Sequence, residues 1–181
     1  LLGVKTPRKT LDGDLKLIDG RPPPDLQGAF YRVGPAQFER AGERLGHWFD
    51  GDGMMQRFAI ANGRVHHRGR FVDTPKRREE EAAGRFLYSG YGFAPKSPSG
   101  IRNPDTLNAA NTAVLPIADE VWALWEGGSP YRIDPQSLET RGRKVFCGGI
   151  GTRARLALAL GFPRTATNNE IVQHVMKKNR E

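Results

Sequence analysis

Residues 54–72 read MMQRFAIANGRVHHRGRFV, and this stretch predicts the fold class of the chain. Asn62-Gly63 lies between two runs in which apolar side chains alternate with polar ones. Both residues tolerate the positive φ angles of a two-residue type I′ turn, so the stretch predicts an antiparallel hairpin. Phe58 and Ile60 are expected on one face of its first strand, because side chains alternate along a strand.

Short apolar runs on both sides of this hairpin also predict strands. Before it, residues 28–33 (GAFYRV) are expected to form a strand that Gly34-Pro35 ends, because proline cannot donate to a central ladder. The further runs that predict strands are residues 86–93, residues 113–117 with 121–126 as a second hairpin, and residues 131–133 with 144–146 around Asp134-Pro135.

The segments between these runs carry no signal for a long helix. Residues 75–85 are polar and predict an exposed loop or a single helical turn, and residues 96–107 predict a loop. The 22 Gly and 13 Pro are spread among short apolar runs, a pattern typical of many turns. These features favour an all-β fold, and within it part of a β-propeller, although no self-similar repeat is visible.

The chain divides into three segments by composition. Residues 1–27 predict an extended lead-in, because Pro22-Pro23-Pro24 excludes a helix interior and a central strand. Residues 28–150 hold the predicted strands, and residues 151–181 form a divergent basic tail. In this tail Thr167–Glu170 fits a capping box that predicts a short C-terminal helix, whereas the Leu/Ala run 154–160 fits a strand or a helix equally well.

The charge of +8 over 181 residues is unevenly spread, and half of the excess lies in residues 151–181. A basic chain can bind nucleic acid or an anionic membrane surface, or it can simply carry a solvated basic surface. No Lys/Arg cluster is interleaved with stacking aromatic residues, so we expect no nucleic-acid partner. Peripheral membrane contact through the tail stays open.

The sequence contains one cysteine, no long apolar segment and no signal-peptide core, and these features set the expectations for disulfides and for cellular location. The single cysteine, Cys147, excludes an internal disulfide and a multi-cysteine zinc site. No window has 18 apolar residues, so no transmembrane helix is predicted. Residues 1–10 lack the apolar core of a signal peptide, and a cytoplasmic protein is the default expectation.

Two motifs could hold a metal ion and were tested by spacing. Asp50-Gly51-Asp52-Gly53 resembles a calcium loop, but the twelfth position of an EF-hand would fall on Ala59 instead of a glutamate, so a tight turn is predicted. His66 and His67 point to opposite faces of a strand, His47 precedes an aromatic pair, and His174 lies in the tail. The chain therefore has no predicted metal ligands and no predicted catalytic residue.

Residues 122–128, WALWEGG, place a carboxylate at the end of an apolar strand. Strand alternation puts Trp122, Leu124 and Glu126 on one face and Trp125 on the other. Burying a carboxylate is unfavourable unless it is paired. Glu126 is therefore either a residue at the rim of the strand or the partner of a histidine.

Taken together, several motifs resemble the opening of the carotenoid cleavage oxygenases. They are GAFYRVGP (28–35), HWFDGDGMM (47–55), RFVDT (70–74), NAANT (108–112), ALWEGG (123–128) and PYRIDP (130–135) with Leu138-Glu139-Thr140. They occur in one order over residues 21 to about 149. The resemblance implies a seven-bladed β-propeller with iron(II) on its axis. Four histidines would hold the iron, and three glutamates would orient some of these histidines. It implies a dioxygenase that uses dioxygen to cleave a conjugated double bond.

The resemblance also implies roles for single residues. Glu126 matches the first of the glutamates that orient metal-bound histidines, as second-shell carboxylates commonly do. Trp125 matches a position in the substrate tunnel, and Tyr91 falls near another. Members that cleave stilbenes have lysine in place of Trp125, so tryptophan favours an apolar polyene such as a carotenoid or apocarotenoid.

The sequence departs from the family where the resemblance requires the first iron ligand, about thirty residues after Glu126. Residues 156–163, LALALGFP, contain no histidine, and the other three ligands are expected beyond Glu181. The composition from residue 151 is what a shifted reading frame would give. We therefore expect an N-terminal fragment that binds no iron, is inactive, and oligomerises or aggregates through unpaired strands. The alternative is a short non-catalytic protein that binds a membrane surface or a partner through its tail.

Overall fold

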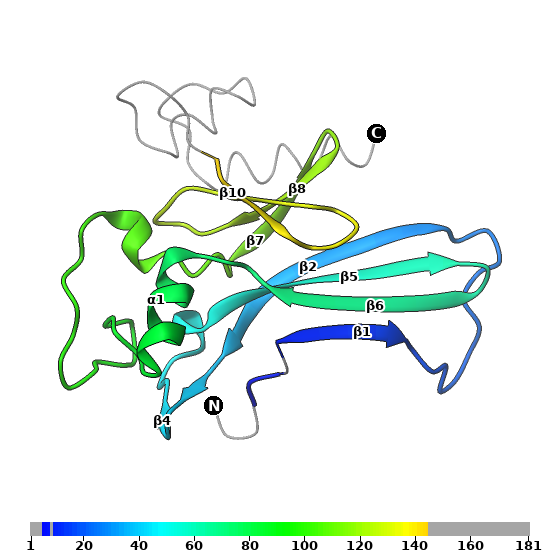
Figure 1. Ribbon diagram of the computed structural model, residues 1–181. Coiled ribbons are helices and arrows are strands. Elements are labelled where there is room, and N and C mark those ends of the chain that lie inside the picture. The colour runs from blue at the N-terminus through cyan, green and yellow to red at the C-terminus, as the bar shows by residue number, and fades with distance from the viewer. Residues whose placement is uncertain (1–4, 8, 145–181) are drawn as a thin grey trace. The chain divides into compact units, whose positions relative to one another are not determined.

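The computed structural model describes residues 5–7 and 9–144, which form two four-stranded antiparallel sheets, a small two-stranded sheet and one α-helix (Figure 1). The first sheet contains β1 (Thr10–Asp14), β2 (Gly28–Gln37), β5 (Asp52–Ala61) and β6 (Arg64–Phe71). The second contains β7 (Ala113–Ile117), β8 (Glu120–Leu124), β9 (Tyr131–Ile133) and β10 (Thr140–Arg143). The remaining elements are β3 (Glu39–Arg40), β4 (Glu43–Arg44), α1 (Pro75–Ala83) and the 3₁₀ helices η1 (Trp48–Asp50) and η2 (Pro104–Leu107).

The hairpin predicted around Asn62-Gly63 forms the centre of the first sheet. The strand order is β1-β6-β5-β2, and β5 pairs with β6 from Met54↔Phe71 to Ala61↔Arg64. Asn62 and Gly63 have φ angles of 51° and 70°, as a type I′ turn requires. This prediction is confirmed because the turn residues and the alternation specify the hairpin locally.

The second sheet has the order β10-β9-β8-β7. Ala118-Asp119 connects β7 to β8, close to the predicted turn, and Ala118 has a φ angle of 52°. After β9 the Asp134 carboxylate accepts hydrogen bonds from the backbone N–H groups of Gln136 (2.9 Å) and Ser137 (2.7 Å). The N–H groups of Ser137 and Gln136 hold the pKa of Asp134 well below its usual value.

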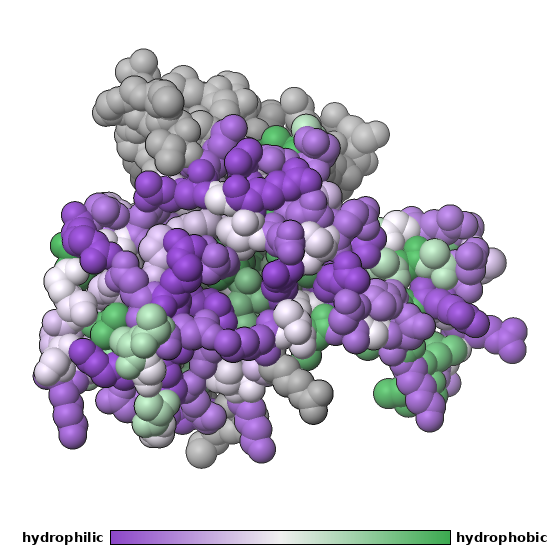
Figure 2. Space-filling model, viewed as in Figure 1, coloured by the Kyte–Doolittle hydropathy of each residue, from purple (hydrophilic) through white to green (hydrophobic). Residues whose placement is uncertain are grey.

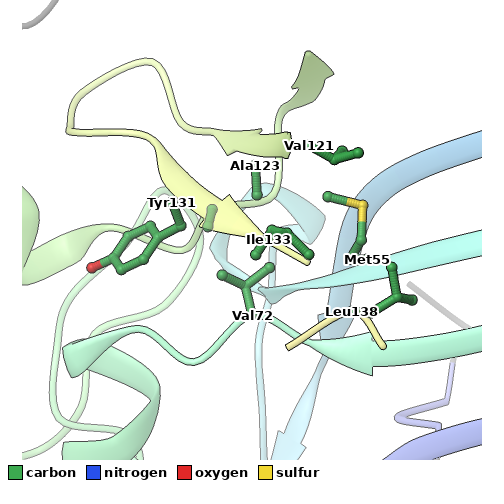
Figure 3. Packing of buried hydrophobic residues seen from close by; sticks show 8 residues of the cluster. Met55, Val72, Val121, Ala123, Tyr131, Ile133 and Leu138 are labelled. Atoms are coloured by element: carbon green, nitrogen blue, oxygen red, sulfur yellow. The ribbon is translucent and has the colours of Figure 1, made fainter. Parts of the chain in front are cut away.

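A core of apolar side chains joins the two sheets (Figure 3). Its buried members are Met55, Val72, Ala110, Val121, Ala123, Tyr131, Ile133 and Leu138. They come from both sheets and from the segments next to them, so neither sheet buries its apolar face alone. Tyr31 Oη also donates a hydrogen bond to Pro135 O (2.8 Å) across the two sheets. Figure 2 shows mainly hydrophilic residues on the surface that it displays.

The expectation of an all-β fold is corrected to a mostly β fold, because residues 75–83 form the helix α1. Thr74 caps its N-terminus by accepting from Arg77 N (3.1 Å), and Pro75 stands at the first helical position. Gly84 ends it in the left-handed region at φ 66°. The predicted exposed loop or single turn is wrong, and two charged residues of α1, Lys76 and Glu80, are buried.

Four other strand predictions need correction. The lead-in 1–27 contains β1, which pairs with β6 far along the chain. β2 continues through Gly34-Pro35, because Pro35 lies in an edge strand of its sheet, where a missing N–H is tolerated. Residues 86–93 contain no strand. The partner of β9 is β10 at 140–143; of the predicted strand 144–146, residues 145–146 lie outside the described residues.

Among the described residues, no helix is long and apolar enough to cross a membrane. The predicted C-terminal helix, the Leu/Ala run and Cys147 lie outside the described residues. The division of the chain at residues 27 and 150 stays a prediction.

Candidate functional site

Glu126 lies just beyond the end of β8 and is exposed. Its Oε2 atom accepts a hydrogen bond from Thr112 Oγ1, and Thr112 immediately precedes β7. Thr112 N also donates to Leu124 O (3.0 Å), which keeps these two ends of the hairpin together. Of the two interpretations of Glu126, its position fits the residue at the rim of the strand, and its described partner is a threonine.

Trp125 and Tyr91 line the same pocket, of about 340 Å³. They are 34 residues apart in sequence, and the resemblance alone had suggested that both face a substrate. Three phenylalanines, Phe49, Phe86 and Phe93, also line this pocket. Aromatic side chains therefore dominate its apolar wall.

Trp125 lies tightly against the glycine pair that follows it. A Cβ atom at Gly127 would be 2.6 Å from Trp125 Cζ3, and one at Gly128 would be 3.0 Å from Trp125 Cε3. A side chain at Gly127 would have to displace the indole ring, and one at Gly128 would first meet Asn108 Nδ2 (2.5 Å) and Asp105 Oδ1 (2.6 Å). The WEGG sequence is thus a local signal for a tryptophan that packs over its own backbone.

The Asp50 carboxylate holds the loop that carries Tyr91. Asp50 Oδ1 accepts from Tyr91 N (2.7 Å) and Oδ2 accepts from Gly92 N (2.9 Å). Gly90 leaves room for this contact, since a Cβ atom there would be 2.2 Å from Asp50 Oδ1. The predicted tight turn at Asp50 is the short helix η1, whose N-cap is His47.

Asn111 connects the η1 segment to the site of Glu126. Its Nδ2 atom donates to Phe49 O (2.8 Å) and to Gly51 O (2.7 Å), and the residue is 7% exposed. Its neighbour in sequence is Thr112, the partner of Glu126. Sequence reasoning used residues 108–112 only as a family motif and missed Asn111 as a contact, because its partners lie about sixty residues away.

A buried ion cluster lies beside the pocket, and two of its members, Lys76 and Glu80, line the pocket wall. Lys76 Nζ lies 2.8 Å from Asp52 Oδ1 and 3.0 Å from Glu80 Oε2, and both carboxyl side chains are almost fully buried. Burial alone would lower the pKa of Lys76, but the charges of Asp52 and Glu80 outweigh it and raise the pKa. Glu80 Oε1 also accepts from Leu87 N (3.1 Å), which connects α1 to the aromatic segment of residues 86–93.

The described histidines are all engaged elsewhere. His66 lies between Asp14 (2.8 Å) and Asp12 (2.6 Å), His67 stacks on Phe58, and His47 accepts from Phe49 N. Within residues 5–7 and 9–144 no group of three or more His, Cys, Asp or Glu side chains could hold a metal ion. The described residues therefore do not fit an iron centre, and His174 lies outside them.

Comparison with known proteins now gives the family. The family model described as retinal pigment epithelial membrane protein matches residues 4–171. This chain belongs to the carotenoid cleavage oxygenase family. The matched range extends past residues 21 and 149 at both ends.

Curated relatives of this family are similar to the chain over most of its length. The apocarotenoid-15,15'-oxygenase of Synechocystis sp. is 39% identical over 170 residues, which are 92% of this chain and 33% of that protein. Resveratrol cleavage oxygenase 1 of Chaetomium globosum is 36% identical over 158 residues, 82% of this chain and 25% of that protein. The chain thus spans a third or less of the length of these relatives.

Solved structures of the family share the described fold. A cobalt-substituted Synechocystis apocarotenoid oxygenase superposes with a TM-score of 0.68 at 38% identity, over 78% of this chain and 30% of that one. Variants of the Synechocystis enzyme replace a tryptophan, the glutamate directly after it, and a threonine 14 positions before that glutamate. They match with TM-scores of 0.67 and identities of 36–37%.

Proposed function

We propose that this chain supplies the aromatic substrate wall and one orienting carboxylate of a non-haem iron(II) dioxygenase. The complete enzyme would cleave a conjugated double bond of a carotenoid or apocarotenoid. The observation that carries the proposal is that Trp125 and Tyr91 line one aromatic pocket. Trp125 is followed directly by Glu126, which pairs with Thr112.

The pocket suits an apolar polyene. Aromatic faces pack well against an extended conjugated chain and offer it little polar contact. The charged residues that line it are Asp50, Lys76 and Glu80. Lys76 pairs with Glu80, and Asp50 accepts hydrogen bonds from two backbone N–H groups. Trp125 in place of lysine favours a carotenoid-like substrate over a phenolic stilbene.

The spacing of Thr112, Trp125 and Glu126 supports the same proposal. It equals the spacing of the threonine, tryptophan and glutamate replaced in the Synechocystis enzyme variants. In the proposed enzyme Glu126 would accept the N–H of a metal-bound imidazole. Because the described residues do not fit an iron site, the histidine ligands are assigned to a part of the enzyme outside them.

The proposal includes the architecture of the complete enzyme. Each large sheet has four antiparallel strands, which is the size of a propeller blade, and we assign them to the first blades of a seven-bladed propeller. The chain of 181 residues alone is proposed to bind no iron tightly and to be inactive. A cytoplasmic location, and membrane or partner binding through residues 151–181, stay separate predictions.

Binding of a polyene to the chain tests this function without requiring turnover. The dissociation constant of all-trans-retinal, a conjugated polyene aldehyde, would be measured by quenching of protein fluorescence. Trp125→Lys is expected to weaken binding about tenfold, the effect of losing about 1.4 kcal/mol. Phe30→Lys is the matched control, because Phe30 is exposed on β2 and is not among the residues that line the pocket.

Three results would contradict the proposal. Wild-type protein that does not bind the polyene would argue against the substrate wall. Equal effects of Trp125→Lys and Phe30→Lys would place binding elsewhere. One equivalent of iron copurifying with residues 1–181 would contradict the proposal that this chain alone binds no iron tightly.

A further inference from the structure

The segment from Phe49 to Gly51 lies between the two parts of the proposed site. On one side Asn111 contacts it, next in sequence to the Thr112–Glu126 pair. On the other side Asp50 contacts the loop that carries Tyr91. The segment therefore joins the orienting carboxylate to the substrate wall.

The contact of Asn111 uses both hydrogens of its amide. Phe49 O and Gly51 O are both acceptors, so one side-chain nitrogen that carries two hydrogens satisfies them together. An aspartate of the same shape would present an oxygen to these carbonyls and donate to neither. The contact is also nearly dry, since Asn111 is 7% exposed, and losing a buried partner is more unfavourable than losing an exposed one.

The hydrogen bonds of Asp50 connect the position of the Phe49–Gly51 segment to the position of the Tyr91 loop in the pocket wall. Its two oxygens accept from consecutive backbone N–H groups, which fixes the position of the Tyr91–Gly92 backbone. The Phe49 and Tyr91 rings meet edge to face with centroids 6.0 Å apart. A shift of the Phe49–Gly51 segment would therefore move two aromatic residues of the wall at once.

We propose that Asn111 is a positioning residue for polyene binding: it fixes the Phe49–Gly51 segment beside Thr112 and, through Asp50, sets the place of Tyr91 on the pocket wall. This inference rests on the proposed function. Asn111 itself is not among the residues that line the pocket, so its effect on the substrate is indirect.

The test measures retinal affinity of residues 1–181 in Asn111→Asp, Asp50→Asn and the double variant. Each single variant is expected to weaken binding about fivefold to tenfold, which corresponds to about 1–1.4 kcal/mol. The double variant should be little worse than either single one, because both changes release the same segment. The matched control is Tyr31→Phe, which removes a part-buried hydrogen bond between the sheets and should leave affinity unchanged.

Amide hydrogen exchange separates positioning from general loss of stability. Exchange at Tyr91 and Gly92 is expected to accelerate in Asn111→Asp, while exchange in β5 and β6 stays as in the wild type. If Asn111→Asp does not fold, Asp50→Asn still tests the connection between the Phe49–Gly51 segment and the Tyr91 loop, because Asp50 is only half-buried and its substitution is milder.

The outcomes distinguish this inference from the function on which it rests. Absence of retinal binding by the wild type would overturn both. Wild-type binding that Asn111→Asp and Asp50→Asn retain would overturn the role of Asn111 alone. Additive effects in the double variant, or uniform acceleration of exchange across β5 and β6, would also overturn it.

Discussion

The Thr112 hydroxyl donates a hydrogen bond to the Glu126 carboxylate across the open end of the β7–β8 hairpin. Thr112 comes directly before β7, and Glu126 comes two residues after β8, so antiparallel pairing brings them together. Both residues are exposed, and neither is needed to complete the core. The pair is therefore placed by the fold without being part of what stabilises it.

Thr112→Val should leave the stability of the chain nearly unchanged. An exposed hydrogen bond contributes at most about 1 kcal/mol, and valine keeps the branched shape at the start of β7. Urea unfolding monitored by circular dichroism would measure the change in the free energy of unfolding. A loss above about 2 kcal/mol would show that the pair belongs to the structural core.

Lys76→Met should strongly destabilise the chain. It leaves Glu80 buried without its cation and Asp52 with the more distant Arg40 (3.8 Å), and removing one partner of a buried ion pair costs about 3–5 kcal/mol. The matched control is Arg78→Met on the same helix, whose partner Asp73 is exposed, and it should cost less than about 1 kcal/mol. Equal denaturation midpoints for the two variants would contradict the importance of the buried cluster.

The two adjacent histidines of β6 should titrate on opposite sides of pH 6.5. Hydrogen bonds from His66 to Asp14 and Asp12 raise its pKa, so its stabilising contribution is present below the ordinary value and is lost as pH rises through the raised one. Burial, then the charge of His66, lowers the pKa of His67, whose contribution is lost as pH falls. NMR titration of the imidazole protons would give both values.

A variant of the same strand pair checks the cause of this difference. Asp14→Asn should lower the pKa of His66 toward 6.5, because the hydrogen bond to Asp14 is the largest contribution to its shift. A pKa of His66 that is unchanged in this variant, or lower than that of His67 in the wild type, would contradict the arrangement of β1 against β6.

Self-association is expected for residues 1–181 at micromolar concentration. Within the described part of the chain, β1 and β2 are the outer strands of the first sheet and β7 and β10 those of the second. Outer strands present N–H and C=O groups to which another chain can pair. Sedimentation velocity over a concentration series would detect association, and a monomer with a sharp, reversible thermal transition would contradict it.

The sequence predicted the parts of the fold that are determined locally. Asn62-Gly63 and the alternation around it specify the β5–β6 hairpin, and the second hairpin of residues 113–126 was predicted almost within its limits. β1 was missed because it is a strand only through its pairing with β6, more than fifty residues away. The charged run of α1 resembled a solvated segment. Partners far along the chain, Asp52 for Lys76 and Leu87 N for Glu80, help to make the burial of both side chains favourable.

The sequence likewise predicted only some of the residues of the candidate site. Trp125, Tyr91 and Glu126 were found through the resemblance of their motifs to the family, and the structure brings the first two together in one pocket. Asp50 had been interpreted as a turn residue and Asn111 as part of a motif. Their contacts join segments about forty and sixty residues apart, and no local pattern reveals such partners.

The hydrogen bonds from the loop to Asp50 come from the backbone N–H groups of residues 91 and 92. These hydrogen bonds are thus independent of which amino acid stands at position 91, and Tyr91 itself is 73% exposed. Substitutions there would change the pocket lining and leave these two backbone hydrogen bonds in place. Position 91 is consequently a place where the lining of the pocket can change while the backbone of its loop stays held.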